Sequence, residues 1–315
     1  MRHLSLRLSL LAALGAAAPV LAQEEAAKPE PVQVFILAGQ SNMVGAGIVP
    51  ADPNRNEGKG TLEWCVKNHP KLFGRLVDDD GNWIVRDDCF VSYFDKRGGL
   101  TVGFGGRENQ IGPELGFGMV MAENYDEPVL LIKVAWGGKS IGKDFRPPSA
   151  GGEVGEFYTK LVEQVRNTLA NIGDHVPGYQ GQGYALVGFG WHQGWNDRIN
   201  QAFNDAYEEN LSCFIRDIRK DLEASDLPFV IAETGMSRHE EKHPRALSLM
   251  AAQAAVAERE EFRNNVAFVG TRDFYRPKEE SPSGQAYHWN NNAETYYRIG
   301  EGMGKAMLEL VRDAR

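Results

Sequence analysis

The feature that most constrains the fold of this chain is the alternation of short apolar runs with segments of helical periodicity. Apolar runs of strand length occupy residues 32–38, 128–135, 184–191, 228–234 and 265–270. Apolar residues recur at helical spacing in 156–172, 202–224 and 245–258, and Asn292 can cap a last helix that runs to about Val311. Buried strands that alternate with helices are typical of a parallel sheet covered on both faces. We therefore predict an α/β fold of three layers, α/β/α, with a central parallel sheet.

The first 22 residues have the pattern of a secretory signal peptide. Basic residues at the start are followed by an apolar stretch over 8–18 and by a small-residue cleavage site that ends at Ala22. We expect residues 23–31 to be a disordered lead-in and residues 32–315 to form the domain. The mature protein is then exported, to the periplasm or the medium.

Composition excludes several classes of partner. The formal net charge is −9, acidic and basic residues are interspersed, and no basic stripe is present. Nucleic acid and anionic membranes are therefore not expected as partners, and no segment after the signal peptide is apolar enough to span a bilayer. In an exported protein Cys65 and Cys89 could pair, whereas Cys213 lies on an apolar helix face. No spacing of cysteine and histidine indicates a zinc site.

A stretch rich in glycine and aspartate, about 46–110, interrupts the alternating pattern. We interpret it as a β-rich insertion after the first strand, with a hairpin at 75–85 around the turn 78–82. The turn is similar to the start of a calcium loop, but it lacks the later glutamate of an EF-hand, so we expect no metal there. The insertion follows the first strand closely and is expected to overhang the site.

A candidate nucleophile follows the first apolar run. The sequence Gly39-Gln40-Ser41-Asn42-Met43 comes directly after residues 32–38. A serine on a sharp turn at the carboxyl end of a buried strand is where a hydrolase of the α/β type exposes its nucleophile. A polar turn with no chemistry is the alternative for these residues alone.

Serine needs a base that accepts its proton. His288 lies in a loop after the last strand, and such loops gather at the same sheet edge as Ser41. We predict that His288 is the base, with His192, also at a strand end, as the second choice.

Acyl transfer also needs donors for the developing oxyanion. The backbone N–H of Ser41 is one candidate, and Gly137 and Gly138 follow another strand and can supply a second. Gln193 or Asn196, after a third strand, could add a side-chain amide.

These segments together resemble the SGNH hydrolases, and most closely the sialate O-acetylesterase-like carbohydrate esterases of carbohydrate esterase family six. The run 39–43 is similar to the family's nucleophile block, 133–138 to its glycine block, 191–194 to its Trp-x-Gln-Gly block, and His288 to its histidine. The resemblance covers residues 32 to about 310 apart from the insertion. It implies an SGNH, flavodoxin-like fold, a Ser–His acyl-enzyme mechanism without a cofactor, and removal of acetyl groups from sugars or polysaccharides.

The sequence departs from the family at both usual positions of the acid that orients the histidine. Trp195 stands where many relatives have glutamate, and Gln285 where the superfamily has aspartate. We expect Asp273 to be the third member, with Asp197 and Glu233 as further choices. Gln285 could instead orient the ring through its amide oxygen.

Several residues near these blocks are candidates for substrate binding. Asp144 and Arg146 lie in a proline-stiffened loop after the glycine block, and tryptophans can stack on sugar rings. The predicted set is Gln40, Trp136, Asp144, Arg146 and Trp195.

The sequence therefore predicts an exported serine esterase that deacetylates an acetylated sugar or polysaccharide. One alternative is a non-catalytic glycan-binding relative, which the two missing acids favour. Another is a serine hydrolase of a different acyl ester, although no long apolar lid segment is visible. The sequence makes no prediction of oligomeric state.

Overall fold

The computed structural model describes residues 30–313. The predicted signal peptide and nearly all of the predicted lead-in lie outside the described residues. Within the described part of the chain, no helix is both long and apolar enough to cross a membrane.

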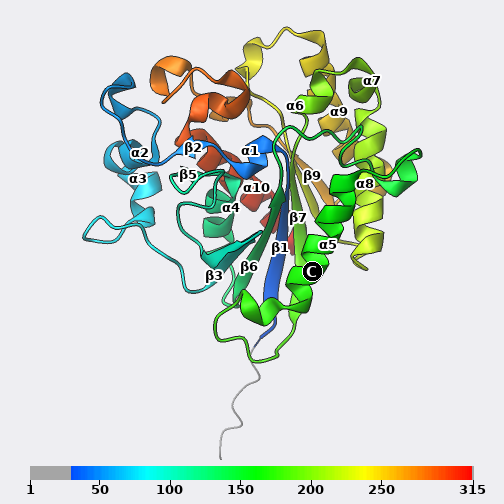
Figure 1. The fold of residues 1–315 in the computed structure, drawn as a ribbon, viewed down its shortest axis with the longest axis horizontal. Coiled ribbons are helices and arrows are strands. Elements are labelled where there is room, and N and C mark those ends of the chain that lie inside the picture. Colours follow the sequence, from blue (N-terminus) through cyan, green and yellow to red (C-terminus); the bar gives the residue numbers. More distant parts are fainter. Residues whose placement is uncertain (1–29, 314–315) are drawn as a thin grey trace, which may run out of the picture.

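A seven-stranded sheet forms the centre of the molecule (Figure 1). Its order is β4-β3-β6-β1-β7-β8-β9, and every neighbouring pair is parallel except β3 and β4. The strands are β1 (Val32–Gly39), β3 (Cys89–Tyr93), β4 (Lys96–Gly99), β6 (Val129–Ala135), β7 (Tyr184–His192), β8 (Phe229–Ala232) and β9 (Val266–Val269). All eight residues of β1 are buried, as expected for a central parallel strand.

Helices cover both faces of the sheet, so the predicted three-layer α/β/α fold is confirmed. One apolar core includes α4 (Pro113–Ala122) and α10 (Ala293–Asp313), and the other includes α5 (Glu156–Ala170), α8 (Tyr207–Asp221) and α9 (Pro244–Glu258). The side chain of Asn292 accepts a hydrogen bond from the Thr295 N–H at 3.1 Å and caps α10 as predicted.

The helix expected over 202–224 is divided in two. It is replaced by α7 (Gln201–Asp205) and α8, which meet at Ala206. The Asn200 side chain caps α7 by accepting a hydrogen bond from the Phe203 N–H at 3.2 Å.

The segment interpreted as an insertion contributes to the main sheet, which the sequence did not predict. β3 pairs in parallel with β6, and β4 forms the antiparallel edge. The rest of the segment contains α2 (Leu62–Asn68), α3 (Pro70–Phe73) and a small separate sheet of β2 (Gly47–Ile48) and β5 (Gln110–Ile111). The expected hairpin reduces to one bridge between Val77 and Trp83, whose turn is held by N–H groups that donate to the Asp78 carboxylate.

The suggested disulfide between Cys65 and Cys89 is not formed, so that prediction is wrong. Cys65 and Cys89 are both free thiols buried in the core that contains α4 and α10, and Cys213 is free and buried in α8. Burial raises the pKa of the Cys65 thiol to about 12, as expected for an inert core cysteine.

Candidate active site

The predicted nucleophile begins a short helix at the carboxyl end of the central strand. Ser41 starts α1 (Ser41–Val44), and the carbonyl of Gln40 accepts hydrogen bonds from the next turn, 2.8 Å from the Met43 nitrogen. Gly39 is required before it, because a Cβ at this position would lie 2.2 Å from the carbonyl oxygen of His192. Close contact with β7 therefore fixes the sharp turn that leaves Ser41 half-buried at the sheet edge.

The glycine loop after β6 lies beside this serine. β6 and β7 flank β1, so the loops that follow these strands meet at the same edge of the sheet. A Cβ added to Gly137 would lie 3.9 Å from Ser41 Cβ and would meet no other atom within 4 Å. Open space therefore exists next to the serine, bordered by the backbone of Gly137 and Gly138.

The side chain of Gln40 joins the serine turn to the loop after β7. Its Oε1 accepts hydrogen bonds from the backbone N–H groups of Gly194 at 3.1 Å and Asn196 at 3.3 Å, and its Nε2 donates to Asn196 Oδ1 at 3.2 Å. Gln40 is almost fully buried. It therefore positions neighbouring groups and presents little surface to a substrate, in contrast to its predicted role in substrate binding.

The side-chain amide of Asn196 contacts the glycine loop. It lies in the short helix α6 (Trp195–Arg198), and its Nδ2 donates to the Gly138 carbonyl at 2.9 Å. This bond holds the amide of Asn196 against the glycine loop, next to the serine.

Gln193 and Asp197 have structural partners instead. The Gln193 Nε2 donates to Asp197 Oδ2 at 2.6 Å and to the Lys139 carbonyl at 2.9 Å, and the side chain is buried. Asp197 also accepts hydrogen bonds from the N–H groups of Ile141 at 2.9 Å and Gly142 at 2.8 Å. Its complete burial raises the pKa of Asp197 to about 6. Gln193 therefore has no free donor for an oxyanion, and Asp197 anchors the glycine loop.

The His288 loop returns from β9 to the serine turn. The Asn42 Nδ2 donates to the Tyr287 carbonyl at 3.2 Å, and the Tyr296 hydroxyl of α10 donates to Asn42 Oδ1 at 2.8 Å. His288 is half-buried, and burial lowers its pKa below the ordinary value of 6.5. In residues 30–313 neither the His288 ring nor the Ser41 hydroxyl makes a hydrogen bond, and catalytic hydrogen bonds are often loose before substrate binds.

His192, the second choice for the base, is completely buried at the end of β7. Burial lowers its pKa to about 4. Its ring lies inside the fold, 6.5 Å between ring centres from Trp289, so it cannot reach a substrate. His288 is the histidine that the structure leaves accessible beside the serine turn.

Each carboxylate proposed as a replacement for the missing acid is bound to another group. Asp273 pairs with His239 at 2.9 Å and its side chain is 84% exposed. Glu233 pairs with Arg272 at 2.9 Å. The side chain of Gln285 makes no hydrogen bond in the part of the chain that the structure describes, although its carbonyl accepts one from the His288 N–H at 2.8 Å. The expectation that Asp273 orients His288 is therefore wrong for this conformation, and no carboxylate within residues 30–313 forms an ion pair with His288.

The predicted substrate residues have different surroundings. The Trp136 ring packs among Phe94, Phe145 and Phe157, with ring centres 5.0 to 6.0 Å apart, and so belongs to an aromatic cluster. Trp195 is half-buried, with Arg198 over its ring at 4.4 Å.

Trp195 also faces an aromatic residue that the sequence did not single out. Its ring centre is 6.0 Å from that of Tyr287, a residue that is 43% exposed. The pair forms an aromatic rim next to His288.

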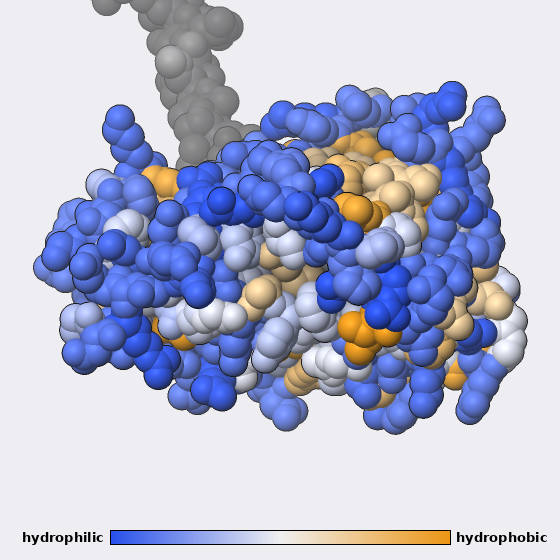
Figure 2. Space-filling model, turned by 90° about the horizontal axis from the view of Figure 1, so that it is seen from above, coloured by the Kyte–Doolittle hydropathy of each residue, from blue (hydrophilic) through white to orange (hydrophobic). Residues whose placement is uncertain are grey.

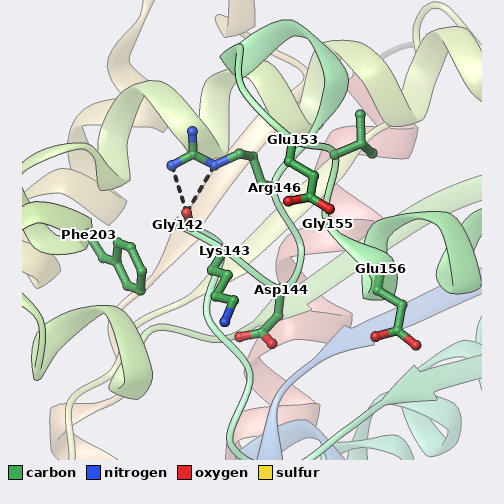
Figure 3. A pocket seen from close by; sticks show the side chains of 9 residues that line it. Gly142, Lys143, Asp144, Arg146, Glu153, Gly155, Glu156 and Phe203 are labelled. Atoms are coloured by element: carbon green, nitrogen blue, oxygen red, sulfur yellow. Dashed lines mark hydrogen bonds between the residues drawn. The ribbon is translucent and has the colours of Figure 1, made fainter.

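Asp144 and Arg146 border a cavity of about 480 Å³ beside the glycine loop (Figure 3). Asp144 accepts hydrogen bonds from the N–H and hydroxyl of Ser140, and the Arg146 guanidinium donates to the Gly142 and Gly151 carbonyls. Both side chains are therefore held in place and retain polar surface toward the cavity.

A buried ion pair beneath the serine helix was not predicted from the sequence. Lys133 Nζ lies 2.6 Å from Glu114 Oε2, and both side chains are completely buried. The ammonium also donates to the carbonyls of Val44 at 2.8 Å and Phe104 at 2.7 Å. Val44 ends α1, so Lys133 holds the helix that begins with Ser41. The sequence did contain one sign of this ion pair, because Lys133 is a charged residue within the apolar run 128–135.

The described residues contain no group of three or more histidine, cysteine, aspartate or glutamate side chains that could hold a metal ion. The groups that the fold gathers beside the serine turn are the His288 loop, the Asn196 amide and the backbone of the glycine loop.

The structure therefore places a serine at the end of the central strand of a three-layer α/β/α fold, with a histidine loop and an amide near it, as the sequence motifs of a hydrolase lead one to expect. The family model described as carbohydrate esterase, sialic acid-specific acetylesterase, matches residues 31–309. The chain therefore belongs to this family, and the resemblance predicted from the sequence motifs is confirmed. Membership in a carbohydrate esterase family supports an esterase.

Similar solved structures share the fold at low sequence identity. A protein from Arabidopsis thaliana is 16% identical with a TM-score of 0.58, and the match covers 88% of this chain and 98% of that one. A carbohydrate acetylesterase from Xanthomonas citri is 12% identical with a TM-score of 0.55. That match covers 89% of this chain and 57% of the Xanthomonas protein. A comparison with curated protein sequences finds no match.

Proposed function

We propose that this protein is an exported carbohydrate acetylesterase that acts through an acyl-enzyme on Ser41. The Ser41 oxygen attacks the acetyl carbonyl while His288 accepts its proton. The sugar hydroxyl leaves with that proton, and water then hydrolyses the acetyl-serine in the same way. The observation that carries the proposal is the position of Ser41 between the Gly137 backbone and the His288 loop, which Asn42 joins to the serine turn.

The backbone of the glycine loop and the Asn196 amide are the proposed oxyanion donors, together with the Ser41 N–H. Fixed donors aimed at a developing oxyanion are commonly the largest single contribution to acyl-transfer rates. The bonds from Asn196 to Gly138 and to Gln40 support this role, because they fix the amide before substrate arrives.

The surface around the site supports a polar substrate. Figure 2 looks onto the edge where the strands end, and this face is mostly hydrophilic with separate apolar areas. A lipid esterase needs a continuous apolar surface for its acyl chain. Acetyl groups on a sugar therefore fit this face better. The substrates named for the family and for the Xanthomonas citri enzyme agree with this choice.

Export remains a proposal that rests on the first 22 residues of the sequence. Their basic start, apolar stretch and small-residue site at Ala22 support cleavage by a signal peptidase.

The second candidate function is a glycan-binding protein without catalysis. The lack of a carboxylate paired with His288 within residues 30–313 favours it, because the acid of a catalytic triad stabilises the charged imidazole and fixes its tautomer. A dyad without that acid would still hydrolyse esters, but more slowly.

The test is acetate release from p-nitrophenyl acetate and from acetylated oligosaccharides by the mature protein, residues 23–315, and by its Ser41→Ala variant. Ser225→Ala is the matched control, because Ser225 is an exposed serine in the loop that enters β8 at the opposite edge of the sheet. We expect activity in the wild type and the control and none above background in Ser41→Ala. Equal activity in Ser41→Ala would refute the mechanism, and glycan binding without hydrolysis by the wild type would favour the second candidate.

A further inference from the structure

The proposed mechanism does not use the cavity beside the glycine loop. We call it the Gly142 pocket, and it is lined by residues 142–144, Arg146, residues 153–156 and Phe203 (Figure 3). Its volume of about 480 Å³ falls in the range of small-molecule binding sites. Its walls come from the loop after β6, the start of α5 and α7, all at the carboxyl edge of the sheet.

The Gly142 pocket and the oxyanion region are two ends of one loop. Gly137 borders Ser41 and Gly142 lines the pocket, so the backbone between them spans at most about 18 Å. Consecutive residues of α6 hold both ends: Asn196 bonds the Gly138 carbonyl, and Asp197 bonds the Gly142 N–H. The distance from the serine to the pocket is therefore fixed, and a short oligosaccharide can span it.

The pocket offers one apolar wall. The Phe203 ring packs directly on the backbone of Gly142, where an added Cβ would lie 2.5 Å from the ring. Figure 3 shows the ring at one side of the pocket, with Lys143 and Asp144 between it and Glu156. An aromatic ring near hydrogen-bonding groups suits the C–H face and hydroxyls of a sugar.

Lysines next to the pocket neutralise two of its three carboxylates. Asp144 pairs with Lys139 at 3.6 Å and Glu156 pairs with Lys160 at 2.6 Å. The charges of the lining without such a partner are those of Lys143, Arg146 and Glu153. Lys143 and Glu153 form no ion pair in the part of the chain that the structure describes, and are free to bind hydroxyl groups.

We infer that the Gly142 pocket is a second sugar subsite, which binds a sugar residue a short distance along the chain from the acetylated one. The inference rests on the proposed function and deepens it: the enzyme acts on oligosaccharides or polysaccharides in preference to single sugars. Binding energy gained in the pocket then raises kcat/KM only for substrates long enough to reach it.

The experiment compares kcat/KM on partially O-acetylated mono-, di- and tetrasaccharides of β-linked glucose, xylose and mannose, with p-nitrophenyl acetate as the short reference. The variants are Phe203→Ala and Glu153→Ala, and the latter alters only an exposed side chain. Tyr184→Ala is the matched control, because it removes an exposed aromatic ring at the start of β7, on the opposite edge of the sheet.

In at least one series we expect kcat/KM of the wild type and control to rise about tenfold from mono- to tetrasaccharide, equivalent to about 1.4 kcal/mol. Phe203→Ala and Glu153→Ala should each weaken this rise and leave p-nitrophenyl acetate hydrolysis unchanged. No dependence on length in any wild-type series, or an undiminished rise in both variants, would overturn the inference. If the wild type hydrolysed none of these esters, p-nitrophenyl acetate included, the proposed function would be refuted instead. Calorimetry of tetrasaccharide binding to the wild type and to Phe203→Ala would then test separately whether the Gly142 pocket binds sugar; equal binding by both would overturn the inference.

Discussion

The substitution Lys133→Met tests whether the buried ion pair supports the serine helix. Lys133 and Glu114 are both completely buried, and the lysine ammonium satisfies one carboxylate oxygen and two backbone carbonyls at 2.6 to 2.8 Å. Methionine keeps the length of the side chain but leaves the buried Glu114 carboxylate without its ion-pair partner. Breaking a buried pair from one side costs about 3–5 kcal/mol. That is a large part of the roughly 5–15 kcal/mol that typically stabilises a domain.

The assay is urea unfolding at pH 7 followed by tryptophan fluorescence, with the free energy of unfolding obtained by linear extrapolation. Lys160→Met is the control, because Lys160 pairs with Glu156 on the exposed face of α5 and should contribute less than about 1 kcal/mol. The double variant Lys133→Met with Glu114→Gln removes the stranded charge. Its loss in free energy of unfolding should be smaller than the sum of the losses in the two single variants by about 1–3 kcal/mol.

A destabilisation below about 1 kcal/mol in Lys133→Met, or strict additivity in the double variant, would show that the pair does not stabilise the fold in this way. Val44 ends the helix that begins with Ser41, so the loss of its lysine partner should also disturb the serine. We therefore expect kcat on p-nitrophenyl acetate to fall in Lys133→Met, measured without urea at a temperature where the variant stays folded.

Three further predictions follow from the site and the core. Only neutral His288 can accept a proton, so kcat/KM should fall as the pH drops through its pKa, with a midpoint below about 6.5 because burial lowers that pKa; a midpoint above that value would indicate a carboxylate partner. Asn196→Ala should reduce kcat by about 10²–10³-fold with little change in KM, if its amide stabilises the oxyanion; an unchanged kcat would remove it from that role. Titration with Ellman's reagent without reductant should detect three thiols after unfolding, since Cys65, Cys89 and Cys213 are free and buried, whereas a disulfide would leave one.

The strands and helices with clear periodicity were predictable, and the fully buried helix α4 and the short strands β3 and β4 were not. β1, β6 and β7 lie within about two residues of the apolar runs that predicted them. α4 escaped prediction because all ten of its residues are buried, so no polar face gives it a helical period. β3 was missed because it is a short strand in a segment rich in charge and glycine.

The parts of the site that follow strands were also accessible from the sequence, since parallel strands bring their carboxyl ends together. The partners of buried charges could not be predicted from the sequence. Lys133 is visible as a charge in an apolar run, but only the fold shows that Glu114, from a helix without periodicity, neutralises it. Likewise Asp273 lies after the last strand as expected, but the approach of His239 from a neighbouring loop decides its partner.

Whether Ser41 is the nucleophile can be read from the site of a covalent adduct. Wild-type protein and the Ser225→Ala control would be treated with a fluorophosphonate, which phosphonylates activated serines, then digested and analysed by mass spectrometry. We expect one adduct on the peptide that contains Ser41, loss of p-nitrophenyl acetate hydrolysis in parallel, and no adduct in His288→Ala, where the serine lacks its base. An adduct on another serine, or an active enzyme without one on Ser41, would contradict the proposed mechanism.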